Sequence, residues 1–444
     1  MKIDIKNTKI GILGLARSGI AVAYKIKELG GNPFLSEFKP AKEIPNSSEL
    51  KNDFRCEFGG HSEKLFDNEL IIVSPGIPLN VPIIKELKKR KVKLIGEIEF
   101  GFLIKHPRSK IIAVTGSNGK STTVSLIHHI LKTLGFKSIL AGNIGNAFTS
   151  FPIEKEGIDF IILELSSFQL DSIDTFRPDV AILLNITPDH LNRYENFEAY
   201  ADAKFKIFQN QKPDDLAILN LDDDTFSFKR QNIAAKKRYF SLKNKTDIFF
   251  DGEKIIYSGK KLPLSGSSLK GFHNIANIMA SLLALSAFEI DPTDFMRALK
   301  TFSPLPHRLE PVTEKNGVKF INDSKATNTD SVKYALQSFE NPIRIILGGS
   351  DKGEDFSVLL PYLQKHAVKV YLIGETRSKM KKAFAGKIET SEFDNFQDCI
   401  ETAFREAKEG DIVLLSPACA SYDMFDNFEQ RGNIFKQIVK RLEK

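Results

Sequence analysis

The stretch IIAVTGSNGKSTTVSLIHHIL, from Ile111 to Leu131, joins an apolar run to a helical pattern through a small polar loop. The β-branched run predicts a buried strand, and the spacing of apolar residues after the loop predicts a helix. Backbone amides and a helix N-terminus at such a loop can hold phosphate groups. The sequence therefore predicts a nucleotide triphosphate site, formed by Gly116, Ser117, Asn118, Gly119, Lys120, Ser121 and Thr122.

In this interpretation Lys120 reaches the terminal phosphates and the Ser121 hydroxyl binds Mg²⁺. The match to the full Walker A pattern is incomplete, because Val114 stands where that pattern has its first glycine. A plain strand-to-helix turn that carries a lysine is the alternative. The order strand, loop, helix favours the phosphate site.

Composition indicates an ordinary globular protein of 444 residues, long enough for two to four domains. The net charge of +7 is spread among interspersed acidic residues, which suits small anionic substrates better than nucleic acid. Three scattered cysteines are too few for a disulfide framework or a zinc site. The start has no signal-peptide pattern and the chain no long apolar run, so we expect a cytoplasmic enzyme without a membrane partner.

Short β-rich runs alternate with helical patterns through most of the chain. Examples are KIGILGL (Lys9–Leu15), DVAILLNIT (Asp179–Thr187) and IRIILGGSD (Ile343–Asp351). Near-continuous apolar strands between helices predict an α/β fold with parallel sheets covered on both faces. The segment Lys236–Leu264 instead predicts short strands and turns, as a β-rich flap on the middle domain.

Candidate boundaries near Gly96 and Pro304 divide the chain into domains 1–95, 96–304 and 305–444. Ligands of open α/β sheets bind beyond the carboxyl ends of the strands, so the polar residues there are the candidate site. Glu164 ends one β run and could bind the Mg²⁺ that Ser121 touches, or be a solvated strand end. His190 could be a second metal ligand or a loop histidine without a role. Lys204, on its own, has the pattern of a surface lysine.

The first domain has a glycine-containing turn with Gly11, Gly14 and Gly19, which is not a strict G-x-G-x-x-G pattern. Glu37 follows the next apolar run, where a dinucleotide fold has its ribose-binding acid. The turn is a weak signal for NAD. It could equally hold the diphosphate of a nucleotide sugar.

In the last domain, three segments rich in hydroxyl, charged and small side chains follow strands and could hold a zwitterion or dicarboxylate. They are FINDSKATNTDS (Phe320–Ser331), LGGSDKGEDF (Leu347–Phe356) and SPACASYDMFDNFEQRG (Ser416–Gly432). Cys419 has no local signature of a nucleophile, and a small buried cysteine is the more common case.

These motifs together resemble the Mur ligases, ATP-dependent enzymes that form amide bonds in peptidoglycan synthesis. The motifs that carry the resemblance lie in family order along essentially the whole chain: TGSNGKST, GNIG, LELSSFQL, NITPDHLNRY, GFHNIAN, LPHRLE, NDSKATN and LLSPACAS with NFEQRG. The resemblance implies an N-terminal Rossmann-like domain for the UDP-linked substrate, a central ATPase-like domain and a C-terminal Rossmann-like domain for the amino acid. NDSKATN and the last motif are similar to the branch that adds D-glutamate to UDP-N-acetylmuramoyl-L-alanine.

The resemblance also implies a reaction in which ATP phosphorylates the substrate carboxylate. The amine of D-glutamate then attacks the acyl phosphate, and phosphate leaves from a tetrahedral intermediate. Two Mg²⁺ ions are implied, one matched to Ser121 and Glu164 and the other to His190 and Lys204. Lys204 aligns with the family lysine that CO₂ converts to a carbamate, which is an anionic oxygen ligand. Lys120, Glu164, His190 and Lys204 are the implied catalytic residues.

Further site residues follow by motif position. The resemblance implies nucleotide contacts from Asn274, Asn277, Arg308 and Asp323. It implies contacts to the UDP-linked substrate from Arg17, Ser18, Glu37, Lys39, Ser74, Pro75, Gly76, Asn143 and Ser166. It implies a D-glutamate pocket formed by Lys325, Thr327, Lys352, Ser421 and Phe428. Some Mur ligases have a third glycine in the glycine-containing turn of the first domain, whereas this chain has the sequence GLARSG there.

Other functions are compatible with parts of the sequence. Related ligases add L-alanine, a diamino acid or a dipeptide, and folylpolyglutamate synthetase is a more distant relative. An NAD(P)-dependent oxidoreductase would use the first domain but leaves GSNGKST unexplained. A non-catalytic nucleotide switch would bind nucleotide without turnover. The sequence contains no large self-complementary apolar patch, so we expect a monomer.

Overall fold

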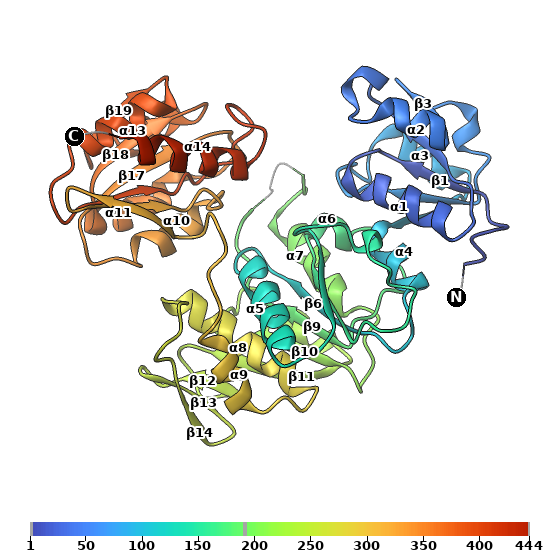
Figure 1. The fold of residues 1–444 in the computed structure, drawn as a ribbon, viewed down its shortest axis with the longest axis horizontal. Coiled ribbons are helices and arrows are strands. Elements are labelled where there is room, and N and C mark those ends of the chain that lie inside the picture. Colours follow the sequence, from blue (N-terminus) through green and yellow to red (C-terminus); the bar gives the residue numbers. More distant parts are fainter. Residues whose placement is uncertain (1–2, 190–192, 443–444) are drawn as a thin grey trace. The chain divides into compact units, whose positions relative to one another are not determined.

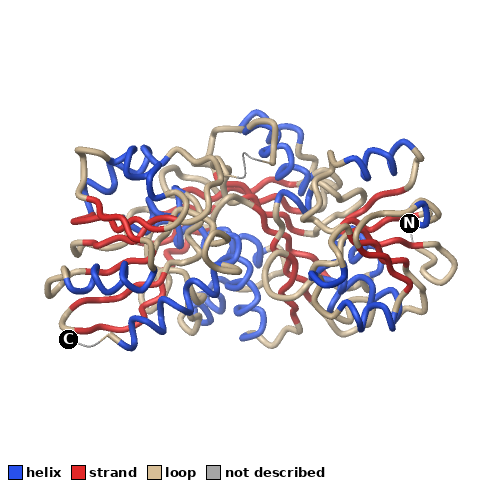
Figure 2. The backbone as a smooth tube through the Cα atoms, turned by 90° about the horizontal axis from the view of Figure 1, so that it is seen from above, coloured by secondary structure: helices blue, strands red, loops and turns tan. Residues whose placement is uncertain are grey.

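The computed structural model describes residues 3–189 and 193–442, and these form three mainly parallel β-sheets with helices (Figures 1 and 2). The predicted α/β class is confirmed. The described residues divide into two compact units: residues 3–186, 197–267 and 275–302 form one, and residues 187–189, 193–196, 268–274 and 303–442 form the other. The predicted domain boundaries stay a prediction.

The N-terminal sheet is parallel throughout, with the strand order β3-β2-β1-β4-β5. Its strands are β1 (Ile10–Leu13), β2 (Phe34–Glu37), β3 (Arg55–Phe58), β4 (Leu70–Val73) and β5 (Lys93–Gly96). Its helices are α1 (Arg17–Glu28), α2 (Ser47–Asp53), α3 (Pro82–Lys89) and α4 (Glu97–Ile104). Alternate residues of β4 enter separate cores: Ile72 packs in one, Ile71 and Val73 in the other. Helices therefore cover both faces of this sheet.

The central sheet has the order β14-β13-β12-β11-β10-β9-β6-β8-β7. Its first five strands along the chain are β6 (Lys110–Thr115), β7 (Ser138–Gly142), β8 (Phe160–Glu164), β9 (Val180–Leu183) and β10 (Leu216–Asn220). They are followed by β11 (Lys236–Ser241), β12 (Ile248–Phe250), β13 (Lys254–Tyr257) and β14 (Lys260–Pro263). The predicted β-rich segment is thus an extension of the main sheet: β11 pairs in parallel with β10, and only β12, β13 and β14 form an antiparallel edge.

The helices of the central part are α5 (Lys120–Thr133), α6 (Ser167–Leu170), α7 (Phe197–Phe205), α8 (Phe272–Ser286) and α9 (Pro292–Leu299). Helix α5 packs against β7 and β8, and the phosphate loop lies at its start. Short 3₁₀ turns throughout the chain are η1 (Ala41–Glu43), η2 (Glu63–Leu65), η3 (Phe148–Ser150), η4 (Lys206–Phe208), η5 (Ser227–Asn232) and η6 (Phe356–Leu359).

The C-terminal sheet has the order β15-β16-β20-β17-β18-β19, with an antiparallel β15–β16 hairpin at one edge. Its strands are β15 (Glu310–Lys315), β16 (Val318–Asn322), β17 (Ile343–Gly348), β18 (Ala367–Ile373), β19 (Thr390–Phe393) and β20 (Ile412–Leu415). Its helices are α10 (Thr329–Leu336), α11 (Leu360–His366), α12 (Arg377–Phe384), α13 (Phe396–Arg405) and α14 (Phe428–Arg441). Along β17, Ile345 and Leu347 pack in one core and Ile346 in the other, as the period of a strand requires.

The carboxyl ends of the parallel strands carry most of the predicted site residues. Glu37 ends β2, Glu164 ends β8, and Asp323 directly follows β16. No helix within residues 3–189 and 193–442 is long and apolar enough to cross a membrane.

Candidate functional site

The phosphate loop connects β6 to α5 and depends on two glycines with positive φ. Gly116 has φ 149° and Gly119 has φ 85°. A Cβ at Gly119 would lie 2.4 Å from Oδ1 of Asn277 on α8, so a side chain there would force the Asn277 side chain to move. Gly119 is the N-cap of α5 and has no side chain with which to cap the helix. The start of α5 is therefore shaped to receive an anionic group.

Lys120 bends back over this loop. Its Nζ donates to the carbonyl oxygens of Gly116 (2.7 Å) and Ser117 (2.8 Å). Ser121 is buried in the first turn of α5. Both side chains thus lie at the loop where the sequence analysis predicts phosphate and Mg²⁺ contacts.

Asn185 fixes the shape of the phosphate loop, and sequence reasoning missed it. Its carbonyl oxygen accepts from the Ser117 amide, its Oδ1 accepts from the Asn118 amide, and its Nδ2 donates to the Asn118 carbonyl. Tyr200 adds a hydroxyl contact to Ser117 Oγ at 3.1 Å. Asn185 opens the NITPDH motif, but only the fold brings it beside a loop 67 residues away.

Glu164 lies on the strand next to the phosphate strand, where β8 pairs it with Val114 of β6. Its carboxylate is almost fully buried, and Oε1 accepts from Asn143 Nδ2 at 2.9 Å. The structure therefore brings the predicted Mg²⁺ ligand Glu164 together with the predicted substrate contact Asn143. Ser166, by contrast, caps α6, where its Oγ and the Gln169 side chain form a capping box.

Lys204 is buried, with 2% of its surface exposed, so the expectation of a surface lysine from its local pattern is wrong. Its Nζ donates to the Gly116 carbonyl at 2.9 Å and lies 4.5 Å from the centre of the Tyr200 ring. Lys204 belongs to α7, and its side chain reaches the phosphate loop. This placement agrees with a role at that loop, which the family resemblance had implied.

Two of the predicted Mg²⁺ ligands have suitable oxygen atoms. The Ser121 hydroxyl and the Glu164 carboxylate are both hard oxygen ligands, which Mg²⁺ prefers. An ammonium cannot bind a metal, so Lys204 fits a metal site only as a carbamate. His190, the remaining predicted ligand, lies outside the described residues. Among the residues that are described, no cluster of three or more His, Cys, Asp and Glu side chains could hold a metal ion.

The predicted site for the UDP-linked substrate lies at the carboxyl ends of β1, β2 and β4. Ser74 Oγ donates to the Gly14 carbonyl at 2.7 Å, which ties the loop after β4 to the glycine turn after β1. The Glu37 carboxylate accepts from the amides of Leu15 (2.6 Å) and Lys39 (3.0 Å). Arg17 Nη1 donates to the carbonyl oxygen of Gly145 in the GNIG segment. Ser74 and Glu37 therefore both bind the backbone of the turn after β1, at Gly14 and Leu15.

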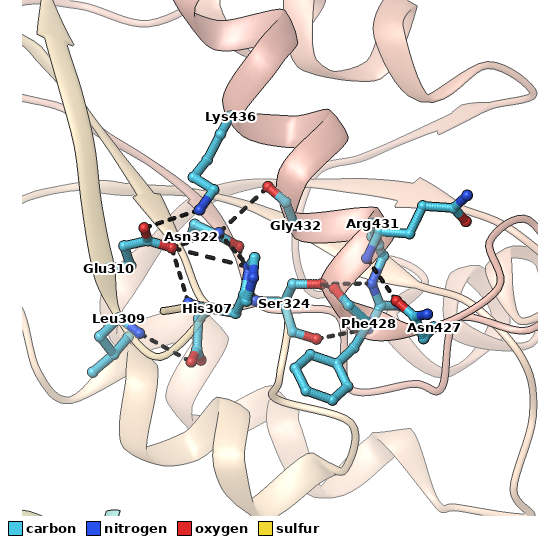
Figure 3. A network of polar contacts seen from close by, with 12 residues as sticks. His307, Leu309, Glu310, Asn322, Ser324, Asn427, Phe428, Arg431, Gly432 and Lys436 are labelled. Carbon is cyan, nitrogen blue, oxygen red and sulfur yellow. Dashed lines mark hydrogen bonds and ion pairs between the residues drawn. The ribbon is translucent and has the colours of Figure 1, made fainter. Parts of the chain in front are cut away.

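The C-terminal unit gathers the predicted amino-acid contacts at the ends of β16, β17 and β20. Lys325 Nζ lies 4.9 Å from the centre of the Phe428 ring, and Ser324 Oγ donates to the Phe428 carbonyl. Ser421 is buried and Thr327 half-buried. Figure 3 shows the polar network at the start of α14 that holds Phe428 in place.

Lys352 lies in a cavity of about 250 Å³ in the same unit. Its Nζ is 3.6 Å from Oδ1 of Asp189, which follows Pro188 in the NITPDH motif. The cavity is lined by Pro188, Asp189, Thr329, Asp330, Lys333, Lys352, Gly353, Glu354, Asp355 and Val358. Burial raises the pKa of Glu354 to about 7, although its carboxylate accepts from the Thr329 amide.

Asp323, a predicted nucleotide contact, is buried at the end of β16. Its carboxylate accepts from the Leu309 amide and from Ser416 Oγ, yet burial raises its pKa to about 7. Arg308 contributes a favourable charge interaction with Asp323, so these two predicted contacts are neighbours. Asn274 and Asn277 lie three residues apart on α8.

Cys419 is buried behind the amino-acid contacts. Burial raises the pKa of its thiol to about 12, and the thiol contacts Thr376 Oγ1. A thiol of this pKa is protonated at neutral pH, so the expectation of a structural cysteine agrees with the structure.

The loop between β6 and α5, with the buried polar side chains beside it, has the form of a nucleotide-binding loop of an α/β enzyme. Family models match three consecutive parts of the chain: "Mur ligase MurD-like, N-terminal domain" at residues 8–96, "Mur ligase middle domain" at 114–285, and "Mur ligase, glutamate ligase domain" at 307–419. The chain belongs to the Mur ligase family.

Curated relatives match over almost the full length of both chains. Proteins named UDP-N-acetylmuramoylalanine–D-glutamate ligase are 42% identical in Cytophaga hutchinsonii, over 98% of this chain and 99% of the relative, and 36% identical in Salinibacter ruber, over 99% of each. Among solved structures, MurC from Thermotoga maritima aligns with a TM-score of 0.64 at 20% identity, over 98% of this chain and 99% of its own. MurF from the same organism, in complex with ADP, aligns with a TM-score of 0.64 at 17% identity, over 99% and 100%. The predicted three-domain α/β architecture is the fold of these enzymes.

Proposed function

We propose that this chain is the ligase that joins D-glutamate to UDP-N-acetylmuramoyl-L-alanine in an ATP-dependent step of peptidoglycan synthesis. One observation carries the proposal: relatives that bear this name match along the entire course of the chain, through all three sheets, and not in the nucleotide-binding part alone. The geometry of the phosphate loop and of the C-terminal cavity supports it.

The reaction has two steps. A carboxylate oxygen of the alanyl group attacks the γ-phosphorus of ATP, the bond from that phosphorus to the bridging oxygen breaks, and ADP leaves. The amine nitrogen of D-glutamate then attacks the carbonyl carbon of the acyl phosphate and gives a tetrahedral intermediate. That nitrogen loses a proton, the carbon–oxygen bond to phosphate breaks, and the amide remains. A free carboxylate is a poor acylating agent, so the phosphorylation supplies the leaving group.

Phosphoryl transfer depends mainly on position and on neutralised charge. The amides of residues 116–122 and the start of α5 bind the phosphates, and Lys120 turns from the Gly116 and Ser117 carbonyls to the terminal phosphate. Asn277, whose side chain lies against Gly119, contacts the nucleotide from α8, together with Asn274. Arg308 and Asp323 are the remaining proposed nucleotide contacts.

Bound Mg²⁺ would neutralise the charge on the transferring phosphoryl group. Ser121 and Glu164 would hold one ion, and His190 and a carbamylated Lys204 would hold the other. Carbamylation would form a bond between Lys204 Nζ and the carbon of CO₂: the ammonium first loses one proton, and the nitrogen loses a second proton when the carbon–nitrogen bond forms. The change would replace the ammonium cation of Lys204 by an anion. Lys204 and Lys120 both donate to the carbonyl oxygen of Gly116, so the anion would lie close to Lys120.

The UDP-linked substrate binds along the carboxyl ends of β1, β2 and β4. Its contacts are Arg17, Ser18, Glu37, Lys39, Ser74, Pro75 and Gly76 for the UDP part, with Asn143 and Ser166 nearer the reacting group. Amides of the glycine turn after β1 suit the diphosphate. The hydrogen bond of Asn143 to Glu164 links substrate position to the Mg²⁺ ligands.

D-Glutamate binds in the C-terminal unit, through Lys325, Thr327, Lys352, Ser421 and Phe428. Lys352 pairs with the side-chain carboxylate, because a charge-assisted bond to a carboxylate selects a dicarboxylic amino acid. Oδ1 of Asp189 lies 3.6 Å from Nζ of Lys352 in the structure. The side-chain carboxylate of bound D-glutamate would replace Asp189 as the partner of Lys352. The active species is expected to be a monomer.

Mass analysis of the product tests the proposal. With ATP, Mg²⁺ and UDP-N-acetylmuramoyl-L-alanine, D-glutamate should give a product heavier by one glutamyl residue. Hydroxylamine in place of D-glutamate should trap the acyl phosphate as a hydroxamate, in wild type but not in Lys120→Ala. A glutamyl product without any ATP dependence would contradict the proposed chemistry.

A further inference from the structure

Arg431 is the largest side chain that is fully buried, among those the structure describes, and the proposed chemistry leaves it without a role. It lies in the first turn of α14, three residues after Phe428. Only 1% of its surface is exposed. Figure 3 shows its guanidinium directed from α14 toward the segment that carries Ser324.

The guanidinium donates to neutral oxygen atoms. Nε donates to Ser324 Oγ (3.0 Å) and Nη2 to the Ser324 carbonyl (2.8 Å). Nη2 also donates to the Cys419 carbonyl (3.1 Å), and Nη1 to the Ala420 carbonyl (3.3 Å). None of the ion pairs found within residues 3–189 and 193–442 includes Arg431. All three guanidinium nitrogens donate hydrogen bonds, and Asp423 and Asp323 act on the charge without forming an ion pair with it.

This arrangement differs from that of the other buried arginine in the same sheet, Arg344. Arg344 Nε is 2.8 Å from the Asp411 carboxylate, and Nη1 is 3.8 Å from Glu406. It lies near the start of β17, away from the end where Gly348 meets the loops of the pocket. Buried charges are usually paired, as Arg344 is, because desolvation of an unpaired ion is costly. Burial lowers the pKa of Arg431 to about 10, so it remains a cation at neutral pH.

Each acceptor of Arg431 belongs to a segment that carries a proposed D-glutamate contact. Ser324 precedes Lys325, and Cys419 and Ala420 precede Ser421. Ser324 Oγ in turn donates to the carbonyl of Phe428. The loop after β17 passes close to the guanidinium, since a Cβ added to Gly349 would lie 3.2 Å from Nη1. These loops follow β16, β20 and β17, which are neighbours in the sheet.

We propose that Arg431 is a positioning residue for the amino-acid substrate: it ties the pocket loops after β16 and β20 together beside the loop after β17, and it puts beneath them a positive charge that no described carboxylate binds directly. The charge favours a dianionic side-chain and α-carboxylate pair over a neutral or cationic amino acid. The inference rests on the proposed function and adds to it a residue that does not touch the substrate. Loss of Arg431 therefore weakens D-glutamate binding and leaves the nucleotide and UDP-substrate sites intact.

The test compares Michaelis constants for all three substrates. Arg431→Lys keeps the charge but cannot reach all the acceptors, and Arg431→Gln loses the charge. Because small displacements in a site have large effects, we expect KM for D-glutamate to rise about 10-fold in the Lys variant and about 100-fold in the Gln variant. KM for ATP and for UDP-N-acetylmuramoyl-L-alanine should stay within about twofold. Arg344→Lys is the matched control, which should lower Tm without a change in KM for D-glutamate.

Ser324→Ala keeps the test decisive if both Arg431 variants fail to fold. It removes one acceptor of the guanidinium and one bond to Phe428, so KM for D-glutamate should rise about threefold. Equal losses for all three substrates, or an unchanged KM for D-glutamate in folded variants, would overturn the proposal. Equal KM values for the Lys and Gln variants would overturn its electrostatic part. Wild-type protein that does not use D-glutamate would instead count against the proposed function.

Discussion

Lys120 and Lys204 donate to the same oxygen atom, the carbonyl of Gly116, at 2.7 and 2.9 Å. They come from helices α5 and α7, and the fold brings two ammonium groups together at the phosphate loop. Two cations so close repel each other unless an anion lies between them or one of them changes its charge. In the proposed function, bound phosphate would place an anion between the two ammonium groups, and carbamylation would change the charge of Lys204.

Lys120→Ala should reduce kcat by about 100- to 1,000-fold, because Lys120 neutralises charge on the transferred phosphoryl group. Binding of the UDP-linked substrate should be unchanged, since Lys120 is not among its proposed contacts. Calorimetric titration with that substrate and steady-state kinetics measure the two effects. Lys132→Ala, an exposed lysine on the same helix, is the control and should behave as wild type.

Lys204→Ala should lose activity, and Lys204→Glu should keep a measurable part of it, because a carboxylate replaces the carbamate as an oxygen ligand. The wild-type protein supplied with ¹³C-bicarbonate should show a carbamate signal by NMR that is absent from both variants. Lys206→Ala, which alters a partly exposed lysine paired with Asp171, should retain that signal. Full activity in both Lys204 variants would exclude the proposed role.

Glu97→Gln should stabilise the protein above pH 7. Burial raises the pKa of Glu97 to about 7 from the ordinary value of 4.5. Between these pH values the folded state holds a proton that the unfolded chain has released, so stability falls as pH rises, by up to about 3 kcal/mol. Glutamine keeps both bonds from Thr149, which end on one oxygen. The gain should be largest at pH 8.5 and small at pH 4.5, as measured by urea denaturation.

Glu99→Gln is the matched contrast on the same helix, and it should destabilise at every pH in that range. Both oxygens of Glu99 accept backbone amides: Asp174 and Phe176 donate to one and Thr175 to the other. The side-chain NH₂ group of a glutamine at position 99 would face backbone N–H groups that donate to Glu99. We expect this to lower the free energy of unfolding by about 2 kcal/mol. A Glu97→Gln variant that loses stability as Glu99→Gln does would contradict this account of Glu97.

Glu354→Gln should lower KM for D-glutamate at pH 8.5 and leave it unchanged at pH 5.5. The pKa of Glu354 is raised to about 7, so it is neutral below that pH and adds a negative charge to the cavity above it. That charge opposes an anionic substrate. The other charged groups that line the cavity are Asp189, Asp330, Lys333, Lys352 and Asp355. We expect a change of about threefold in KM, measured across the pH range. A ratio of variant to wild type that does not vary with pH would contradict it.

The sequence predicted the architecture because its signals are local. Apolar runs such as residues 160–164 are buried whichever helices cover them, and polar residues after each run mark the carboxyl ends of parallel strands. The segment Lys236–Leu264 was only partly predicted: its strands are short, and no local signal tells β11, which joins the main sheet, from the antiparallel edge.

The sequence did not predict, from residues alone, which polar groups the fold would bury. Lys204 lies in the helix FEAYADAKF, and a single lysine in such a helix predicted a surface position. Asn185 and Arg431 act through contacts with residues 67 and about 100 positions away, and such contacts leave no periodicity in the chain. Family resemblance pointed to Lys204 but not to the other two. His190 lies outside the described residues.

The most direct test of the central claim is phosphate release from ATP with UDP-N-acetylmuramoyl-L-alanine, Mg²⁺ and bicarbonate, measured with D-glutamate, L-glutamate, L-lysine or no amino acid. We predict sustained release with D-glutamate alone. Release with a different amino acid would contradict the specificity assigned to the Lys352 cavity. No release under any of the four conditions would contradict the ligase itself.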